Sequence, residues 1–239
     1  MFSPRRSTAT RAAAFAAASV LALAGCGLDI SDLEDPKPSS SDSPSAGGDG
    51  EGTPLGEALE QLEVAEEKRD GYDRRLFKHW TDADGDGCDT RREVLIAEAV
   101  SPPEQGDRCA ISGGEWLSYY DGETVTDAAK LDIDHMVPLA EAWDSGAHSW
   151  DDDRRERFAN DLDADASLVA VTARSNRSKG DKDPAEWLPP AKDTHCTYAA
   201  EWVGTKLRWK LSVDTAEKAA LGTLADSCTD TAVAIEPAP

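Results

Sequence analysis

The chain has 239 residues, with 47 acidic and 25 basic side chains and a formal net charge of −22. A body this acidic repels nucleic acid at long range, so composition alone argues against a nucleic-acid-binding protein. The length accommodates one domain of ordinary size with additional segments. Any nucleic-acid chemistry must therefore come from a local arrangement of residues.

Residues 1–25 are predicted to be an export signal. Arginines precede an alanine-rich apolar run, residues 12–24, that is too short for a permanent transmembrane helix. The run ends in "LAGC", a pattern typical of bacterial lipoprotein signals, in which Cys26 becomes the lipidated first residue. The alternative is an ordinary secretory signal with an incidental cysteine. Both interpretations predict an extracytoplasmic protein, either secreted or anchored by lipid to the cell membrane.

Residues 26–54 are rich in Ser, Pro, Asp and Gly and predict a flexible acidic tether, which leaves residues 55–239 for one folded domain. An even number of further cysteines in an exported chain indicates two disulfides. Sequence-local pairing is favoured because each bond closes a modest loop. A zinc site is the alternative, but no CxxC spacing supports it. The favoured pairs are Cys88–Cys109 and Cys196–Cys228.

The first part of the domain alternates between helix and strand patterns. Leucines at helical spacing predict a helix over residues 55–70, and a short helix is expected over residues 73–80. Residues 91–100 fit either a helix or a strand. Aromatic and β-branched residues on both sides of an Asp-Gly turn signal predict a β-hairpin over residues 115–127.

The second part starts with a polar and apolar alternation that predicts a strand over residues 131–135. Pro138 is expected to open a helix over residues 139–144. The elements expected after it are a helix over 150–162, a strand over 167–172, a helix over 173–190 interrupted at Gly180, and a helical region over 194–224 with Trp202, Leu207, Trp209 and Leu211 in the core.

Asp134 and His135 end the first of these two strands, and Asn176 lies on the helix that follows the second. This strand-strand-helix unit resembles the HNH (His-Me finger, ββα-metal) nucleases through "DIDHMVPL" and "SNRSKGDK". More widely, residues 72–190 resemble exported actinobacterial HNH proteins through "DADGDGCDTR", "GGEW", "YDG" and "FANDL". The resemblance covers about half of the chain. It implies an α+β fold in which a ββα-metal core, residues 131–190, is embedded in a mainly helical domain with a small β-hairpin.

Phosphodiester hydrolysis needs an activated water and a counter-charge for the developing anion. A neutral imidazole is a suitable base near neutral pH, and the resemblance assigns this role to His135. It assigns Asp134 and Asn176 as the oxygen ligands of one divalent cation, Mg²⁺ or Mn²⁺. By the same resemblance, Lys179 neutralises the scissile phosphate. Each residue type alone has an ordinary explanation, such as a helix cap for Asn176, but the combination at this spacing favours the functional interpretation.

The sequence departs from the family pattern at the residue that orients the base. Counting nine residues back from Asn176 reaches Ser167 instead of an asparagine, while Asn160 lies further upstream in "FANDL". Either side chain is a candidate to hydrogen-bond His135. Arg177 and Arg91 are candidate phosphate contacts. The other histidines, His79, His148 and His195, have no partner pattern and are interpreted as surface or structural residues.

A second candidate site is the segment "DADGDGCDTRRE", which fits the template of an EF-hand calcium loop. Asp82, Asp84 and Asp86 occupy loop positions 1, 3 and 5, and Glu93 occupies position 12. Position 7 is Cys88, so the alternative is an acidic turn held by a disulfide. A structural Ca²⁺ is therefore a hypothesis.

The sequence thus predicts a monomeric, membrane-tethered, metal-dependent endonuclease, with nucleic acid as substrate and DNA favoured over RNA. The alternative is a calcium-binding envelope lipoprotein with an inactive nuclease fold that serves as a scaffold or adhesion module. A peptidase or serine hydrolase is disfavoured, because the sequence has no HExxH or GxSxG motif.

Overall fold

The computed structural model describes residues 52–239. The predicted signal, the lipidation site Cys26 and nearly all of the tether lie outside the described residues. Within residues 52–239, no helix combines the length and apolar character that crossing a membrane requires. The α-helices are α1 (Leu55–Glu60), α2 (Thr90–Ala97), α3 (Leu139–Asp144), α4 (Asp152–Ala159), α5 (Ala173–Lys179), α6 (His195–Trp209) and α7 (Thr215–Ser227).

The strands of this part of the chain are short and pair antiparallel in twos. The pairs are β1 (Thr53–Pro54) with β8 (Ala232–Val233), β2 (Glu104–Gln105) with β3 (Ile111–Ser112), β4 (Trp116–Ser118) with β5 (Glu123–Val125), and β6 (Leu131–His135) with β7 (Leu168–Thr172). Single 3-10 turns connect several elements: η1 (Arg74–Leu76), η2 (Asp107–Cys109), η3 (Ala128–Lys130), η4 (Ala147–Ser149), η5 (Asp165–Ser167) and η6 (Lys192–Thr194).

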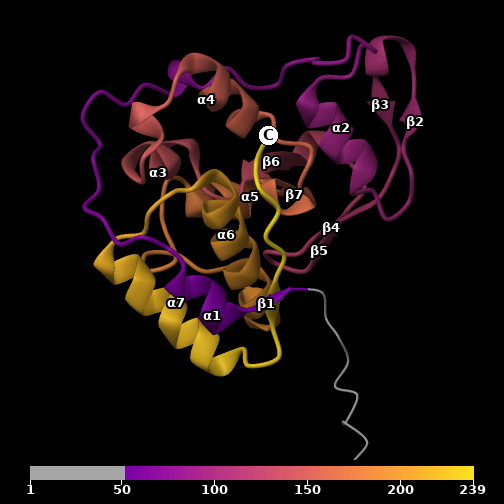
Figure 1. The fold of residues 1–239 in the computed structure, drawn as a ribbon. Coiled ribbons are helices and arrows are strands. Elements are labelled where there is room, and N and C mark those ends of the chain that lie inside the picture. The colour runs from indigo at the N-terminus through magenta and orange to yellow at the C-terminus, as the bar shows by residue number, and fades with distance from the viewer. Residues whose placement is uncertain (1–51) are drawn as a thin grey trace, which may run out of the picture. The chain divides into compact units, whose positions relative to one another are not determined.

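The central unit is the β6–β7 pair with α5, which follows β7 directly and packs on both strands. In Figure 1 the α3 and α4 helices lie on one side of this unit, α2 and the hairpins β2 to β5 lie on the other, and α1, α6 and α7 lie below. The register pairs Leu131 with Thr172 and His135 with Leu168. The insertion between the strands, with α3 and α4, therefore starts and returns at the His135 end of the pair.

The two faces of the strand pair are buried in different cores because side chains alternate along a strand. Leu131 and Ile133 of β6 pack with α2 and the β4–β5 hairpin. Val169 and Val171 of β7 pack in the larger core with α3, α4 and the C-terminal helices. Both faces of β7 are buried, which fits its continuous apolar sequence.

The turn of the β4–β5 hairpin fixes the start of α5. Asp121 in this turn accepts hydrogen bonds from the Thr172 and Ser175 hydroxyls, at 2.5 and 2.7 Å. Thr172 also caps α5 by accepting the amide of Ser175. The predicted Asp-Gly turn is confirmed, and Gly122 takes the left-handed backbone with a φ of 70°.

Most predicted elements are confirmed. The stretch 91–100, whose sequence fits either a helix or a strand, is helical up to Ala97, the end of α2. The helix predicted over residues 55–70 is wrong beyond Glu60, since the backbone of Ala65 bonds to Val213 instead of continuing the helix. The short helix over residues 73–80 is only the η1 turn. No helix follows Gly180 before η6, and the region 194–224 is two helices separated at Lys210.

The predicted disulfides Cys88–Cys109 and Cys196–Cys228 are present. They close loops of 21 and 32 residues, and the first joins the acidic loop to the η2 turn. The second joins the start of α6 to the end of α7.

Replacing Cys196 and Cys228 together with alanine should lower the free energy of unfolding by about 4 kcal/mol, because the closed loop restricts the unfolded chain. The matched pair Cys88→Ala with Cys109→Ala should lose about 3 kcal/mol for its shorter loop. Urea denaturation without reductant measures both. A loss under about 1 kcal/mol for the longer loop would contradict this expectation.

Candidate active site

The predicted catalytic trio converges in one recess of about 200 Å³. Asp134 and His135 reach it from the end of β6, and Asn176 reaches it from α5. Adjacent strand residues normally face opposite sides, so both can serve one recess only where the strand ends. The described strand does end at His135. Arg74 and Arg177 line the same recess.

The imidazole of His135 is held in one tautomer. Its Nε2 lies 3.0 Å from the carbonyl oxygen of Ala159, so Nε2 carries the proton. No described residue hydrogen-bonds the other ring nitrogen, Nδ1. This nitrogen is not fully enclosed by the protein, so a small molecule such as water can reach it. The ring stacks on Trp80 and Phe158, with centroids 5.4 and 6.4 Å away. Burial lowers the pKa of His135 to about 3, which keeps the ring neutral.

Asp134 is bonded through only one of its carboxylate oxygens. Its Oδ2 accepts the Tyr120 hydroxyl at 2.7 Å and the Lys179 ammonium at 2.5 Å. No described residue donates to Oδ1. Burial raises the pKa of Asp134 and lowers that of Lys179, while the attraction between the two groups opposes both shifts.

Asn176 also keeps one oxygen available. Its side-chain nitrogen, Nδ2, donates to Asp132 at 3.2 Å, and its side-chain oxygen, Oδ1, has no described partner. Two hard oxygen donors therefore border the same recess, one from Asp134 and one from Asn176. This donor set fits Mg²⁺ or Mn²⁺, which retain several water ligands and take few from the protein.

The prediction that Lys179 neutralises the scissile phosphate is wrong. Its side chain is completely buried, and its ammonium donates to Asp134 and to the carbonyls of His135 and Met136, at 2.9 and 2.8 Å for the carbonyls. All three N–H bonds are therefore used inside the protein. Lys179 joins α5 to the end of β6 instead of facing substrate.

The prediction that Ser167 or Asn160 orients the base is also wrong, because neither side chain bonds the imidazole. Ser167 donates to Asp161 at 2.7 Å. Asn160 accepts the Thr81 amide at 3.1 Å and donates to the Lys78 carbonyl at 2.8 Å. The orienting acceptor is the main-chain carbonyl of Ala159, which no side-chain motif could reveal.

Asn160 nevertheless acts on the site through its neighbours. It immediately follows Ala159, and it fixes the segment 78–81, which carries Trp80 over the His135 ring. Trp80 has a φ of 60°, a left-handed conformation that is strained for a tryptophan. The hydrogen bonds of Asn160 on both sides of Trp80 stabilise this backbone. Sequence reasoning missed Trp80, because no spacing pattern links it to His135.

Two arginines line the recess, whereas Arg91, a predicted phosphate contact, lies elsewhere. Arg177 lies 3.5 Å from Asp132 at the recess and is mostly exposed. Arg74, which sequence reasoning missed, lines the recess from the η1 turn. Arg91 lies elsewhere, since it donates to the carbonyls of Ala128 and Leu131 and lines a different cavity. The structure therefore does not bring Arg91 to the recess.

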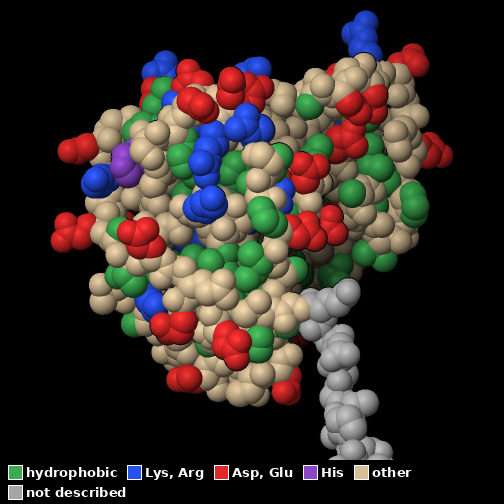
Figure 2. Space-filling model, in the orientation of Figure 1, with side chains coloured by type: hydrophobic (Ala, Val, Ile, Leu, Met, Phe, Trp, Pro, Cys, Tyr) green, Lys and Arg blue, Asp and Glu red, His purple; other side chains and the backbone are tan. Residues whose placement is uncertain are grey.

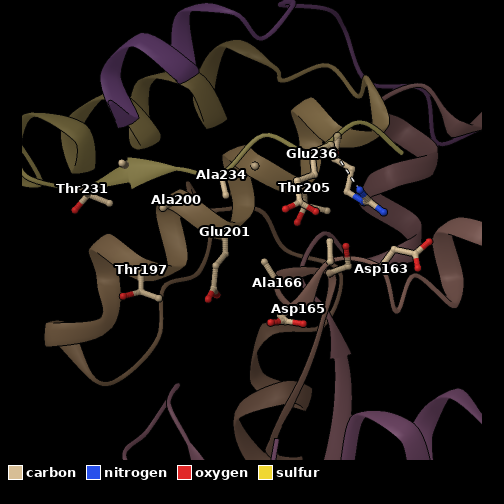
Figure 3. A pocket seen from close by; sticks show the side chains of 15 residues that line it. Asp163, Asp165, Ala166, Thr197, Ala200, Glu201, Thr205, Thr231, Ala234 and Glu236 are labelled. Atoms are coloured by element: carbon tan, nitrogen blue, oxygen red, sulfur yellow. Dashed lines mark hydrogen bonds between the residues drawn. The ribbon is translucent and has the colours of Figure 1, made fainter. Parts of the chain in front are cut away.

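A larger cavity, of about 500 Å³, is separate from this recess. It lies between α6, the η5 turn and the C-terminal segment, and Figure 3 shows carboxylates around it, including Asp165 and Glu201. His135 and Asn176 do not line it. Figure 2 shows acidic side chains scattered over the visible face, with Lys and Arg side chains gathered between α4 and α6. Neither cavity size nor net charge therefore points to the recess that Asp134, His135 and Asn176 line.

The acidic loop gathers the carboxylates that the calcium template predicts. Ligand atoms of Asp82, Asp84 and Asp86 lie within 4.8 Å of one another, and all three residues are exposed. Asp82 accepts the amides of Gly85 and Gly87, at 2.8 and 3.0 Å, so the loop is already folded around it. Burial and the nearby aspartates raise the pKa of Glu93.

Comparison with known proteins identifies the family of this chain. Residues 92–224 match the family described as GmrSD restriction endonucleases, C-terminal domain. An "Uncharacterized secreted protein" from Arthroderma benhamiae is 44% identical over 160 residues, which cover 67% of this chain and 77% of the relative. No solved structure matches the chain. The chain belongs to the GmrSD C-terminal domain family, and its function is related to that of nucleases.

Replacing Asn160 with alanine should loosen the segment 78–81 by removing its side-chain hydrogen bonds. We expect a loss of about 2 kcal/mol in unfolding free energy and faster hydrogen exchange at the Thr81 amide. The control Asn176→Ala removes a single described bond, to Asp132, and should leave Thr81 exchange unchanged. Equal Thr81 protection in wild type and Asn160→Ala would show that Asn160 does not fix this segment.

Proposed function

We propose that the protein is an HNH-type endonuclease that hydrolyses phosphodiester bonds with one divalent cation. In this proposal β6, β7 and α5 are the ββα-metal core. The observation that carries it is the meeting of Asp134, His135 and Asn176 at one recess, with an oxygen, a ring nitrogen and another oxygen left without described partners. The nuclease family to which the chain belongs supports the same chemistry.

His135 is the general base. Its Nε2 proton is retained by the Ala159 carbonyl, so Nδ1 is the nitrogen that takes a proton from water. Stacking on Trp80 and Phe158 restricts rotation of the ring and so fixes the direction of the Nδ1 lone pair. An anionic phosphate in the recess favours the imidazolium form, which raises the pKa of His135 from its low value in the free protein.

Asp134 and Asn176 would hold the cation through Asp134 Oδ1 and the Asn176 side-chain oxygen. When bound, Mg²⁺ or Mn²⁺ supplies positive charge against the negative charge that develops on the phosphate and the leaving oxygen. Arg74 and Arg177 line the recess and are the phosphate contacts of this proposal. DNA is the substrate to test first, because the family is described as restriction endonucleases.

The protein acts outside the cytoplasm in this proposal. Two disulfides form in the domain, and disulfides persist in oxidising compartments. The Arthroderma benhamiae relative is named as a secreted protein. Attachment to a membrane through a lipid on Cys26 is part of the same proposal, and so is a monomeric state. The competing proposal is a calcium-binding envelope scaffold with an inactive nuclease fold, favoured by the acidic charge.

Replacing His135 with alanine should reduce plasmid cleavage in Mg²⁺ or Mn²⁺ by 10²- to 10⁴-fold, the usual contribution of a general base. The matched control is His195→Ala, because His195 Nε2 also bonds a main-chain carbonyl, that of Pro189 at 2.9 Å, but lies outside the recess. Digestion of DNA and RNA side by side with Mg²⁺, Mn²⁺ or EDTA measures activity. Wild-type rates in His135→Ala would exclude His135 as the base, and no cleavage by the wild type would favour the scaffold.

We also propose that the loop Asp82–Glu93 binds Ca²⁺ as a structural ion. Calorimetric titration of the wild type should give one Ca²⁺ site, and Asp84→Asn should weaken it at least 10-fold by removing a carboxylate ligand. The control is Asp163→Asn, an exposed carboxylate outside the loop. If the wild type takes up no Ca²⁺, the loop is an acidic turn held by Cys88.

A further inference from the structure

Asp134 is held by the protein through one carboxylate oxygen, while the other is not enclosed and faces the recess. The residue is 5% exposed, and both described donors, Tyr120 and Lys179, reach the same oxygen, Oδ2. Buried carboxylate oxygens normally accept hydrogen bonds. The oxygen that accepts none from the described residues belongs to the side chain that lines the recess with His135 and Asn176.

The two donors are themselves immobile. Tyr120 is completely buried, packs against Trp187 and Tyr198, and its carbonyl accepts the Ala191 amide at 3.0 Å. Lys179 is fixed by its bonds to the carbonyls of His135 and Met136. Their separate anchoring means that Asp134 Oδ2 has a defined position. Because Oδ2 is fixed, the direction of Oδ1 is fixed as well.

Stability alone does not explain this arrangement. A buried ion pair contributes little net stability, since desolvation offsets the attraction between the charges, and apolar residues of similar volume often replace such pairs without loss. Both protein donors also reach Oδ2, which leaves Oδ1 free on the side of the recess. The arrangement instead fits the outer-shell groups of metal sites, which orient a ligand through the atom that does not touch the metal.

We propose that Tyr120 and Lys179 are positioning residues that hold Asp134 by Oδ2 so that Oδ1 points at the bound cation. This inference rests on the proposed function, because it takes Asp134 as a metal ligand. It assigns a role to the tyrosine of the "YDG" turn and to the buried lysine of α5. Neither residue touches substrate or metal; both act through Asp134.

The sharpest test compares Tyr120→Phe with Tyr198→Phe. Both tyrosines are completely buried, and their rings lie 5.8 and 6.0 Å from the Lys179 ammonium. Only the Tyr120 hydroxyl bonds Asp134, whereas the Tyr198 hydroxyl has no described partner. The two variants therefore remove the same atom from similar surroundings. They differ in whether the bond to Asp134 is lost.

Binding of Mn²⁺, followed by the paramagnetic resonance of the free ion, is the readout that does not depend on activity. The site is defined as the Mn²⁺ binding that Asn176→Ala removes. Tyr120→Phe should raise the Kd of this site about 10-fold or more, the usual effect of removing an outer-shell partner. Tyr198→Phe should change it less than 2-fold. Cleavage by Tyr120→Phe should require more Mn²⁺ but recover most of its kcat at saturating Mn²⁺.

Two failures are distinguishable. If Asn176→Ala leaves Mn²⁺ binding unchanged, the ligand set of the proposed function is wrong, and the inference falls with it. If Asn176→Ala removes the site but Tyr120→Phe binds Mn²⁺ as tightly as Tyr198→Phe, the proposed function stands. Tyr120 and Lys179 are then structural residues only, and the inference is overturned.

Discussion

The rest of the site depends on the three hydrogen bonds that the buried ammonium of Lys179 donates. This ammonium joins the end of β6 to α5 by bonding Asp134 and the carbonyls of His135 and Met136 in the interior. These carbonyls belong to the last residue of β6 and to the residue after it, and the lysine supplies a donor to each of them. By closing this junction, Lys179 holds His135, Asp134 and the helix that carries Asn176 in one arrangement.

The net charge of −22 and a nucleic-acid substrate are compatible because the recess is not itself acidic. Acidic and basic side chains are equal in number there, and the two arginines that face the recess come from two different elements, η1 and α5. A divalent ion would add further positive charge at the point where phosphate must approach. The charged residues that line the recess are Asp134 and Asp181 on one side of this balance and Arg74 and Arg177 on the other.

The sequence predicted the parts of the site whose spacing is local. Strand alternation located Asp134 and His135 on β6, and the cysteine spacing predicted both disulfides. It could not predict contacts made by main-chain atoms or by distant segments, such as the Ala159 carbonyl and Trp80. The family pattern also misled for Lys179, because a motif gives a residue's place in the chain but not its burial. The helix beyond Glu60 failed for a similar reason, since tertiary pairing with Val213 replaced local propensity.

The central claim is that side chains from two separate segments share one cation. Nuclear magnetic resonance with substoichiometric Mn²⁺ tests it directly, because the ion broadens signals only near itself. The account predicts that amide signals around Asp134–His135 and around Asn176 broaden together, at the same Mn²⁺ concentration. Broadening at only one of these segments, or only in the loop Asp82–Glu93, would contradict it.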